Sequence, residues 1–437
     1  MKKFSSYKDS GVVWLREIPS EWKINKIKYL ASLPKEQVSV SAFKDKEVVH
    51  YSIPNVQALG TGSLESGADI DSSKLILYGG EIIISKLNPR KSTISIVREH
   101  SEMIVASGEF VVIKPTDIER AFLYYVIISK PYTEFLDAQT ESVTRSHQRV
   151  NPEVIHNSIV AYPTRKVQDA IVSFLDDKTS QIDALISNSE KKIELLKEKR
   201  TALINQVVTK GLDPNVKMKD SGVDWIGEIP LSWTVGRLGY YTTKVGSGST
   251  PRGGSEIYSG YGVKFIRSQN VYNSGLRLED VVFITEAIHR TMRGTNVRMG
   301  DLLLNITGGS IGRCCIVNIP DEMNVNQHVS IIRTKETLLN YYLNYFLQSN
   351  SGQSQVEIFQ TGGNREGLTA DNIKSFSIVV PLKEEQQQIV KYLDHHTAEI
   401  DKEVSLEQRR IELLKEYRQS LISEVVTGKI NVLDYAS

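Results

Sequence analysis

The chain has 437 residues, of which 40% are hydrophobic and 24% charged, and its formal net charge is +1. This length allows about two to four domains with full hydrophobic cores, and the near-zero charge argues against a protein that binds nucleic acid through overall basicity alone. The longest apolar run (121–128) is too short to cross a bilayer and the start lacks an apolar signal core, so we expect a cytoplasmic protein without membrane contact.

The first part of the chain begins with a short box at residues 8–22, which reads KDSGVVWLREIPSEW. Short apolar runs broken by Gly, Pro, Asn and Ser follow, a pattern that is typical of strands. We expect strands at 80–85, 94–97 and 110–113, and a helix rich in Tyr and Leu at 121–129.

Residues 163–208 have a helical pattern without internal Pro or Gly. Apolar residues recur at spacings of three, four and seven, which predicts the narrow seam of a coiled coil between charged, solvated faces. The alternative is an amphipathic helix that packs on its own domain. The helix should end near Gly211. The predicted seam residues are Ile171, Leu175, Ile182, Ile186, Ile193, Leu196 and Leu203.

The second part of the chain repeats the first. The box returns at 219–233 as KDSGVDWIGEIPLSW, and strand-like runs lie at 263–266, 301–305, 315–317 and 329–332. A Tyr- and Leu-rich helix is expected at 338–349, and a second long helix follows and ends near Gly428. Its predicted seam residues are Ile389, Leu393, Ile400, Val404, Ile411, Leu414 and Leu421.

This duplication predicts an α+β protein with two pseudo-symmetric globular α/β domains, separated by two long helices whose seams would pack against each other as a coiled coil. We expect a first domain at 1–162, a central helix at 163–210, a second domain at 211–380 and a final helix with its tail at 381–437. Such a protein suits a partner or ligand that itself has two halves.

Motifs of several enzyme classes are missing from the sequence. It has no Gly-x-x-x-x-Gly-Lys-Ser/Thr phosphate loop, no His-Glu-x-x-His, no Cys-x-x-Cys and no Gly-x-Ser-x-Gly, and its eight histidines are scattered without ligand spacing. The only cysteines, Cys314 and Cys315, are neighbours and therefore poor disulfide partners. We expect no catalytic residue and no metal site. An enzyme with degenerate motifs, and a coiled-coil adaptor or structural protein with two protein-binding domains, remain as alternatives.

Loops rich in Gly, Arg, Asn and Gln follow the predicted strands in both copies, and these side chains can read base edges through paired hydrogen bonds. The Gly-rich stretches 246–254 and 307–313 could bring backbone amides close to phosphates, or could simply be tight turns. The candidate DNA-binding residues are Asn55, Gln57, Lys86, Asn88, Arg90, Lys91, Arg145, His147, Gln148 and Arg149 in the first copy, and Arg252, Arg267, Ser268, Gln269, Asn270, Tyr272, Thr307, Ser310, Asn364 and Arg365 in the second.

The whole chain resembles the DNA-specificity (S) subunit of type I restriction–modification systems. The resemblance is carried by the joint VVTKGLDPNVKMKDSGVDWIGEIPLSW at 207–233 and by the paired Gln-x-x-Ile…Leu-Asp…Ile-Asp helices at 168–183 and 386–401. It implies that two target-recognition domains each read one half of a split site in double-stranded DNA. It also implies that the two long helices form an antiparallel coiled coil that sets the distance between the half-sites.

The same resemblance implies a non-catalytic subunit that works inside a larger complex. Two modification subunits would supply adenine-N6 methylation from S-adenosylmethionine, and two restriction subunits would supply ATP- and Mg2+-dependent translocation and cleavage. The cofactors would therefore belong to the partners. In a related system, the methylase and nuclease share one polypeptide, and the sequence does not separate these two arrangements.

Overall fold

The computed structural model describes residues 3–144, 147–251, 253–360 and 367–433. For residues 141–144, 147, 254 and 255 it describes the backbone alone. The chain forms two compact units, Met1–Glu190 with Arg409–Ser437 (unit 1) and Lys191–Gln408 (unit 2). Two long helices, α5 (Arg165–Lys210) and α10 (Lys383–Val426), contribute a segment to each unit. Over the part of the chain that is described, no helix combines the length and the apolar character that a membrane span needs.

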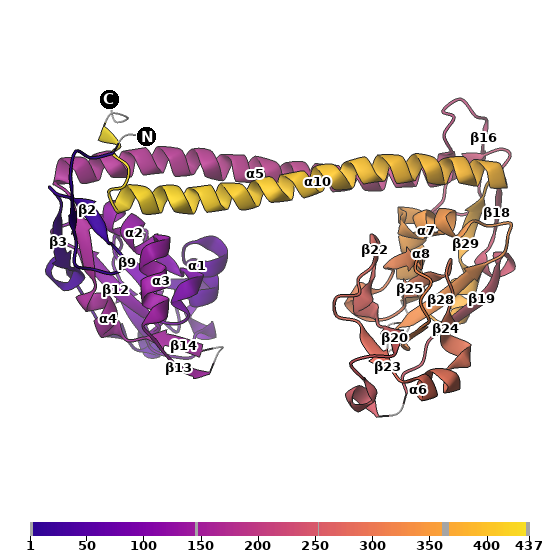
Figure 1. Cartoon of the computed structure of the whole chain (residues 1–437), viewed down its shortest axis with the longest axis horizontal. Coiled ribbons are helices and arrows are strands. Elements are labelled where there is room, and N and C mark those ends of the chain that lie inside the picture. Colours follow the sequence, from indigo (N-terminus) through magenta and orange to yellow (C-terminus); the bar gives the residue numbers. More distant parts are fainter. Residues whose placement is uncertain (1–2, 145–146, 252, 361–366, 434–437) are drawn as a thin grey trace. The chain divides into compact units, whose positions relative to one another are not determined.

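The globular part of unit 1 contains two main sheets (Figure 1). In the larger sheet β6 and β11 pair in parallel, and the other neighbours are antiparallel. One sheet has the order β10 (Ile94–Ile96), β9 (Ile82–Ser85), β12 (Phe110–Pro115) and β4 (Ala31–Ser32); the other has the order β5 (Gln37–Val38), β8 (Lys74–Leu77), β11 (Met103–Ala106), β6 (Glu47–Tyr51) and β7 (Ser63–Ser66).

Unit 2 repeats this topology, except that its second sheet as described has no counterpart of β5. Its parallel pair is β20 with β27, which corresponds to β6 with β11. One sheet has the order β19 (Thr242–Ser247), β28 (Val329–Thr334), β25 (Leu302–Asn305) and β26 (Cys314–Ile316); the other has the order β23 (Val282–Ile284), β20 (Val263–Ile266), β27 (Met323–Val325) and β24 (Asn296–Val297). Cys314 and Cys315 are both buried and free, as expected from their adjacency.

Short strand pairs and short helices complete both units. The paired strands are β1 (Tyr7–Asp9) with β2 (Glu17–Pro19), β3 (Lys23–Lys26) with β15 (Ile159–Tyr162), β13 (Thr140–Thr144) with β14 (His147–Val150), β16 (Met218–Asp220) with β17 (Glu228–Pro230), β18 (Thr234–Arg237) with β29 (Ser377–Val380), and β21 (Val271–Tyr272) with β22 (Gly275–Leu276). The helices are α1 (Ile53–Leu59), α2 (Arg120–Ile128), α3 (Lys130–Ala138), α4 (Pro152–Asn157), α6 (Glu286–Thr291), α7 (Asn340–Gln348), α8 (Asn350–Gln360) and α9 (Ala370–Ser375).

Two matched contacts attach each globular part to the long helices. In unit 2 the fully buried Gln386 side chain donates to the carbonyls of Thr337 (3.1 Å) and Pro381 (2.9 Å) and accepts from the Leu339 amide (2.8 Å). In unit 1 Gln168 likewise donates to a proline carbonyl (2.8 Å) and accepts from a backbone amide at the start of α2 (2.8 Å). This glutamine of the Gln-x-x-Ile motif therefore fixes where each long helix begins.

The second matched contact is a tyrosine that donates to an aspartate on a long helix. The hydroxyl of Tyr125 donates to Asp176 at 2.6 Å, and that of Tyr345 donates to Asp394 at 2.7 Å. Desolvation by burial, together with these carboxylate neighbours, raises the pKa of both phenols far above the usual value. Both tyrosines therefore stay neutral donors at physiological pH.

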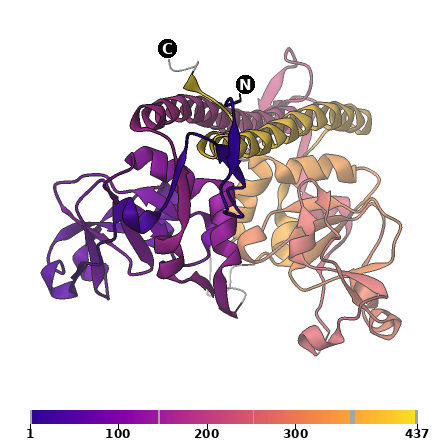
Figure 2. The ribbon, with the colours of Figure 1, turned by 60° about the vertical axis from the view of Figure 1, so that its left-hand side comes forward.

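The ends of the long helices receive the repeated boxes. In unit 1 the Tyr7 hydroxyl donates to the Gly428 carbonyl at 3.2 Å, so the first box lies beside the last turn of α10, indigo beside yellow in Figures 1 and 2. Gly428 has a φ of 73°, and a Cβ there would lie 2.4 Å from Pro19. In unit 2, Gly211 (φ 76°) ends α5 against the buried Trp233.

Inside each unit, an equivalent Arg–Asp ion pair joins the segments of the two long helices. Arg418 contacts Asp183 at 2.9 Å in unit 1, and Arg200 contacts Asp401 at 3.2 Å in unit 2, at equivalent positions of the repeat. Of the predicted seam, nine residues are buried and Ile186, Leu203, Val404, Ile411 and Leu414 are half-buried; the buried ones are Ile171, Leu175, Ile182, Ile193, Leu196, Ile389, Leu393, Ile400 and Leu421.

Candidate nucleic-acid interface

In unit 1 the loop between β9 and β10 meets the β13–β14 hairpin. The Asn88 amide donates to the Gln148 carbonyl at 2.8 Å, and the Val150 amide donates to the Lys86 carbonyl at 3.0 Å. Asn88 adopts a left-handed conformation (φ 50°), which turns the chain so that this contact can form. The structure therefore brings six of the predicted DNA-binding residues close together: Lys86, Asn88, Arg90, Lys91, Gln148 and Arg149.

Several of these side chains already have protein partners. Arg149 forms a two-pronged ion pair with Glu109 (2.9 and 3.2 Å), and the Lys86 ammonium donates to the Gly108 carbonyl at 2.7 Å. Arg90 and Lys91 are exposed, and Arg90 reaches only a long 3.5 Å contact to Gln148. Arg145 lies outside the described residues, and only the backbone of His147 is described.

Asn55 is held inside a polar network beside this loop. Its side-chain amide donates to the His50 carbonyl (3.0 Å), to Ser63 (2.6 Å) and to the Glu65 carboxylate (2.6 Å). Burial alone would raise the pKa of Glu65, but the hydrogen bonds from Asn55, His50 and Ser63 outweigh it and leave the pKa below its ordinary value. Asn55 thus positions the start of α1, while the exposed Gln57, two residues further along, donates to Thr93 at 2.9 Å.

In unit 2 the corresponding loop joins β25 to β26 and meets the turn at 268–270. Asn305 donates to the Ser268 carbonyl (2.8 Å) and to the Ser310 hydroxyl (3.1 Å), so these two predicted residues lie close together. The hydroxyl of Thr307 is 2.6 Å from Nδ1 of His328, a residue that the sequence did not single out. Arg252, Asn364 and Arg365 lie outside the described residues.

The turn at 267–270 is held by Asn270, which is buried as a structural residue. Its side chain accepts from the Arg267 amide (3.0 Å) and donates to the Arg277 carbonyl (2.9 Å). Arg267 itself donates to the Asp280 carbonyl at 2.8 Å, whereas Gln269 is exposed. The buried Asn270 therefore orders the loop, and Gln269 presents its side chain to solvent.

The ring of Tyr272 is contacted by two arginines that were not singled out from the sequence. The guanidinium carbon of Arg277 is 3.9 Å from the centroid of the Tyr272 ring, and that of Arg313 is 5.1 Å from it. Arg313 is the last residue of the Gly-rich stretch at 307–313. Arg277 directly follows β22, five positions after Tyr272. Their spacing in sequence gives no sign that they share one ring, because the contact depends on how two separate loops fold.

One further cluster was also missed. On α10, ligand atoms of His395, His396 and Glu399 lie within 4.8 Å of one another, the single such group of three found among the described residues. No metal site was expected from the sequence, because none of the paired-ligand motifs occurs in it. The cluster is visible in the sequence as two adjacent histidines followed by a glutamate at helical spacing.

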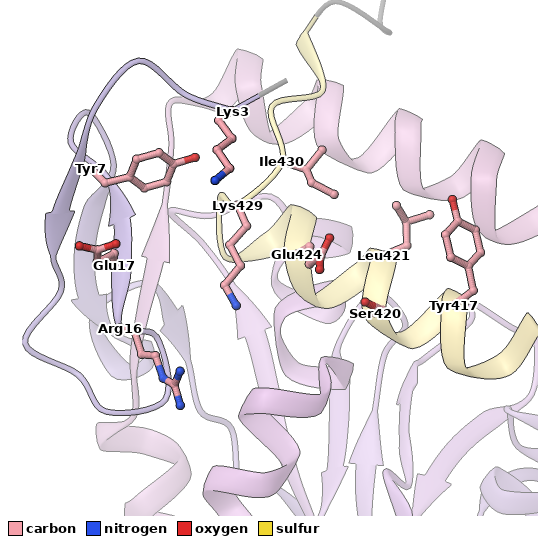
Figure 3. Close-up of a pocket in the computed structure, with 10 residues that line it drawn as sticks. All are labelled: Lys3, Tyr7, Arg16, Glu17, Tyr417, Ser420, Leu421, Glu424, Lys429 and Ile430. Atoms are coloured by element: carbon pink, nitrogen blue, oxygen red, sulfur yellow. The ribbon is translucent and has the colours of Figure 1, made fainter. Parts of the chain in front are cut away.

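Each unit also has a hollow where its box meets the end of a long helix. In unit 1 a cavity of about 810 Å³ is lined by Tyr7 just before the box, by Glu17 of the box, by Tyr417 and Glu424 near the end of α10, and by Lys429 just after it (Figure 3). In unit 2 a smaller cavity of about 360 Å³ lies between 206–218 and Glu228. Tyr7 and Met218 each precede a box by one residue, and Glu17 and Glu228 hold the same place within the two boxes, so the two hollows are equivalent places.

These features define a duplicated protein with two matched globular frameworks that carry different loops. The family described as "Type I restriction modification DNA specificity domain" matches residues 19–195 and 230–415, and the chain therefore belongs to this family, as a specificity subunit of a type I restriction–modification system.

Two relatives and one solved structure agree with this assignment. The chain is 23% identical over 434 residues, 95% of each protein, to a "Putative type I restriction enzyme MjaX specificity subunit" of Methanocaldococcus jannaschii. It is 25% identical over 319 residues to the type I restriction enzyme MjaVIII specificity subunit of the same organism, covering 71% of this chain and 70% of that one. A solved chain from a study of complex assembly and conformational transition of the type I R-M system shares the fold, with a TM-score of 0.74, 17% identity and coverage of 94% and 99%.

Proposed function

We propose that this chain reads a bipartite, asymmetric site in double-stranded DNA, with one short half-site for each unit. The observation that carries the proposal is the contrast between framework and loops. Both units repeat the sheet topology, the buried glutamine, the Tyr–Asp contact and the Arg–Asp pair. The loops on these frameworks differ, with Lys86–Arg90 in one unit where the other has the Gly-rich loop at 307–313. Equal scaffolds with unequal loops suit two readers of different sequences.

The residues that would contact DNA are those whose side chains face solvent at the loop surface. In unit 1 these are Arg90, Lys91 and Gln57, and in unit 2 they include Gln269. Arg149 has its charge matched by Glu109, so it would have to exchange that partner in order to contact DNA. Asn55, Asn88 and Asn270 would act indirectly, by ordering the loops.

The chain would act without its own catalysis. We propose that two methyltransferase subunits supply S-adenosylmethionine chemistry, and that two restriction subunits supply the ATP- and Mg2+-dependent steps. The equivalent hollows beside the two boxes support two docking places for identical subunits. Native mass spectrometry of the purified complex should then give one specificity chain for two methyltransferase chains. A complex with one methyltransferase that modifies both strands at full rate would contradict this arrangement.

Exchange of one loop-bearing segment tests the central proposal. The segment 234–380 would be replaced by that of a relative, because its ends lie in β18 and β29, which pair with each other at Thr234 and Val380. The modified DNA motif should keep one half-site and gain a new second half-site. The matched control replaces residues 23–162, bounded by the equivalent pair β3 and β15, and should change the other half-site. If either exchange changed both half-sites, the two units would not be independent readers.

A further inference from the structure

We propose that Tyr272, Arg277 and Arg313 form a cluster in unit 2 that reads a guanine in the major groove. The proposal rests on the proposed function and adds the base and the side chains. Both guanidinium groups face the Tyr272 ring, at 3.9 and 5.1 Å from its centroid, and both arginines are exposed. No carboxylate in the described parts of the chain lies within 4.0 Å of either guanidinium. The ring attracts both cations, and the pair still lacks a counter-charge.

The matched framework shows that this cluster occupies a variable position. Asn55 and Asn270 are equivalent, so Tyr272 stands where unit 1 has Gln57. Strand pairing gives the second correspondence, because the residue before β26 is Arg313 and the residue before β10 is Thr93. In unit 1 these positions also touch, since Gln57 donates to Thr93 at 2.9 Å. The same two positions therefore meet in both units, with different chemistry.

This difference favours base reading over a phosphate contact. The DNA backbone is the same for every sequence, so a phosphate-binding pair would serve both units equally well with the same residues. A pair that reads bases has to differ when the two half-sites differ. The pair of equivalent positions differs between the units, with Gln57 and Thr93 in unit 1 and Tyr272 and Arg313 in unit 2. This is the result expected for a pair that reads bases.

The chemistry of the cluster favours guanine. An arginine presents paired N–H donors that match the O6 and N7 acceptors of guanine, the commonest specific contact in the major groove. A guanidinium held over an aromatic face keeps this donor edge free and loses less conformational freedom on binding. Arg313 ends the loop that also carries Thr307 and Ser310, so we assign the base contact to Arg313 and the support of the ring to Arg277.

The experiment maps the modified motif in cells that carry the whole system with Arg313→Ala or Arg313→Lys in this chain. Arg237→Ala, an exposed arginine on framework strand β18, is the control for loss of one charge. Arg313→Ala should accept any base at one guanine of the second half-site and leave the first half-site unchanged, which also shows that the protein is folded. Arg313→Lys keeps the charge but lacks the paired donor edge, so it should relax the same position, whereas Arg237→Ala should keep the whole motif.

Binding by the purified complex separates a base contact from a phosphate contact. Replacement of the guanine by 7-deazaguanine, which lacks the N7 acceptor, should weaken wild-type binding while leaving Arg313→Ala unaffected. The Arg313→Ala complex should bind the guanine-containing site about 10- to 100-fold more weakly. Equal weakening on all sequences with a smaller salt dependence would overturn the guanine assignment, and so would an unchanged motif. If the wild-type complex showed no two-part site at all, the proposed function itself would fail, which is a distinguishable result.

Discussion

Replacement of Gln386 by Ala should destabilise unit 2 while leaving unit 1 intact. The Gln386 side chain is fully buried and makes three hydrogen bonds to backbone groups. Each backbone group left without its partner costs about 1 kcal/mol, so we expect a loss of about 3 kcal/mol. For a unit of this size, such a loss lowers the midpoint of thermal unfolding by about 6–12 °C.

The repeat provides a matched control for this prediction. Gln168 makes two hydrogen bonds at the equivalent place, so Gln168→Ala should cost about 2 kcal/mol and act on unit 1. Hydrogen exchange followed by mass spectrometry resolves the two units in the full chain. Protection should fall in β25 and β28 with Gln386→Ala, and in β9 and β12 with Gln168→Ala. Equal loss of protection in both units, or a larger effect from Gln168→Ala, would refute the view that each glutamine fixes its own unit.

Two other predictions concern Asn55 and the long helices. The hydrogen bonds from Asn55 and its neighbours hold the pKa of Glu65 below its ordinary value. Glu65 therefore stabilises unit 1 at pH values above its unfolded pKa of about 4.3. This contribution is lost as the pH falls through the lower folded pKa. Asn55→Ala should raise that pKa toward its ordinary value, measured by NMR titration; an unchanged pKa would remove Asn55 from its positioning role. Deletion of one heptad from each helix (186–192 and 404–410) removes both partners of the Lys192–Glu407 contact together, so neither charge is left behind. Each helix becomes about 10 Å shorter. The preferred DNA spacer should therefore shorten by up to about three base pairs, while both half-sites are kept. A spacer of unchanged length would mean that the helices do not set it.

Much of the fold could be predicted from the sequence because the signals are local and occur twice. The apolar runs at 80–85 and 301–305 are β9 and β25, and the Tyr- and Leu-rich segments are α2 and α7. The parallel pairing of β6 with β11 could not be predicted, because the two strands are far apart in sequence and neither has a distinctive pattern. The predicted helix at 121–129 ends where α2 does, and the buried Ser129 hydroxyl bonds back to α2 there, but the helix α3 that follows was not predicted.

The candidate site was predictable in its loops but less so in its side chains. Residues 86–91 and 148–149 were predicted separately as candidate DNA-binding residues, and the contact between Asn88 and Gln148 places their two loops side by side. Which polar side chains are free depends on partners that lie elsewhere in the chain: Glu109 neutralises Arg149, and Glu65 holds Asn55. Arg277 and Arg313 could not be found from residue type alone, because their common partner, Tyr272, is met only after two loops have folded together.

The central claim is that this chain determines a split DNA site with one unit for each half. The most direct test is a single-molecule map of methylated adenines in genomes that differ only in the presence of this chain. The account predicts a motif that appears only with the chain, made of two different short half-sites separated by a spacer of fixed length. A continuous or palindromic motif, or a methylation pattern that does not depend on the chain, would contradict it.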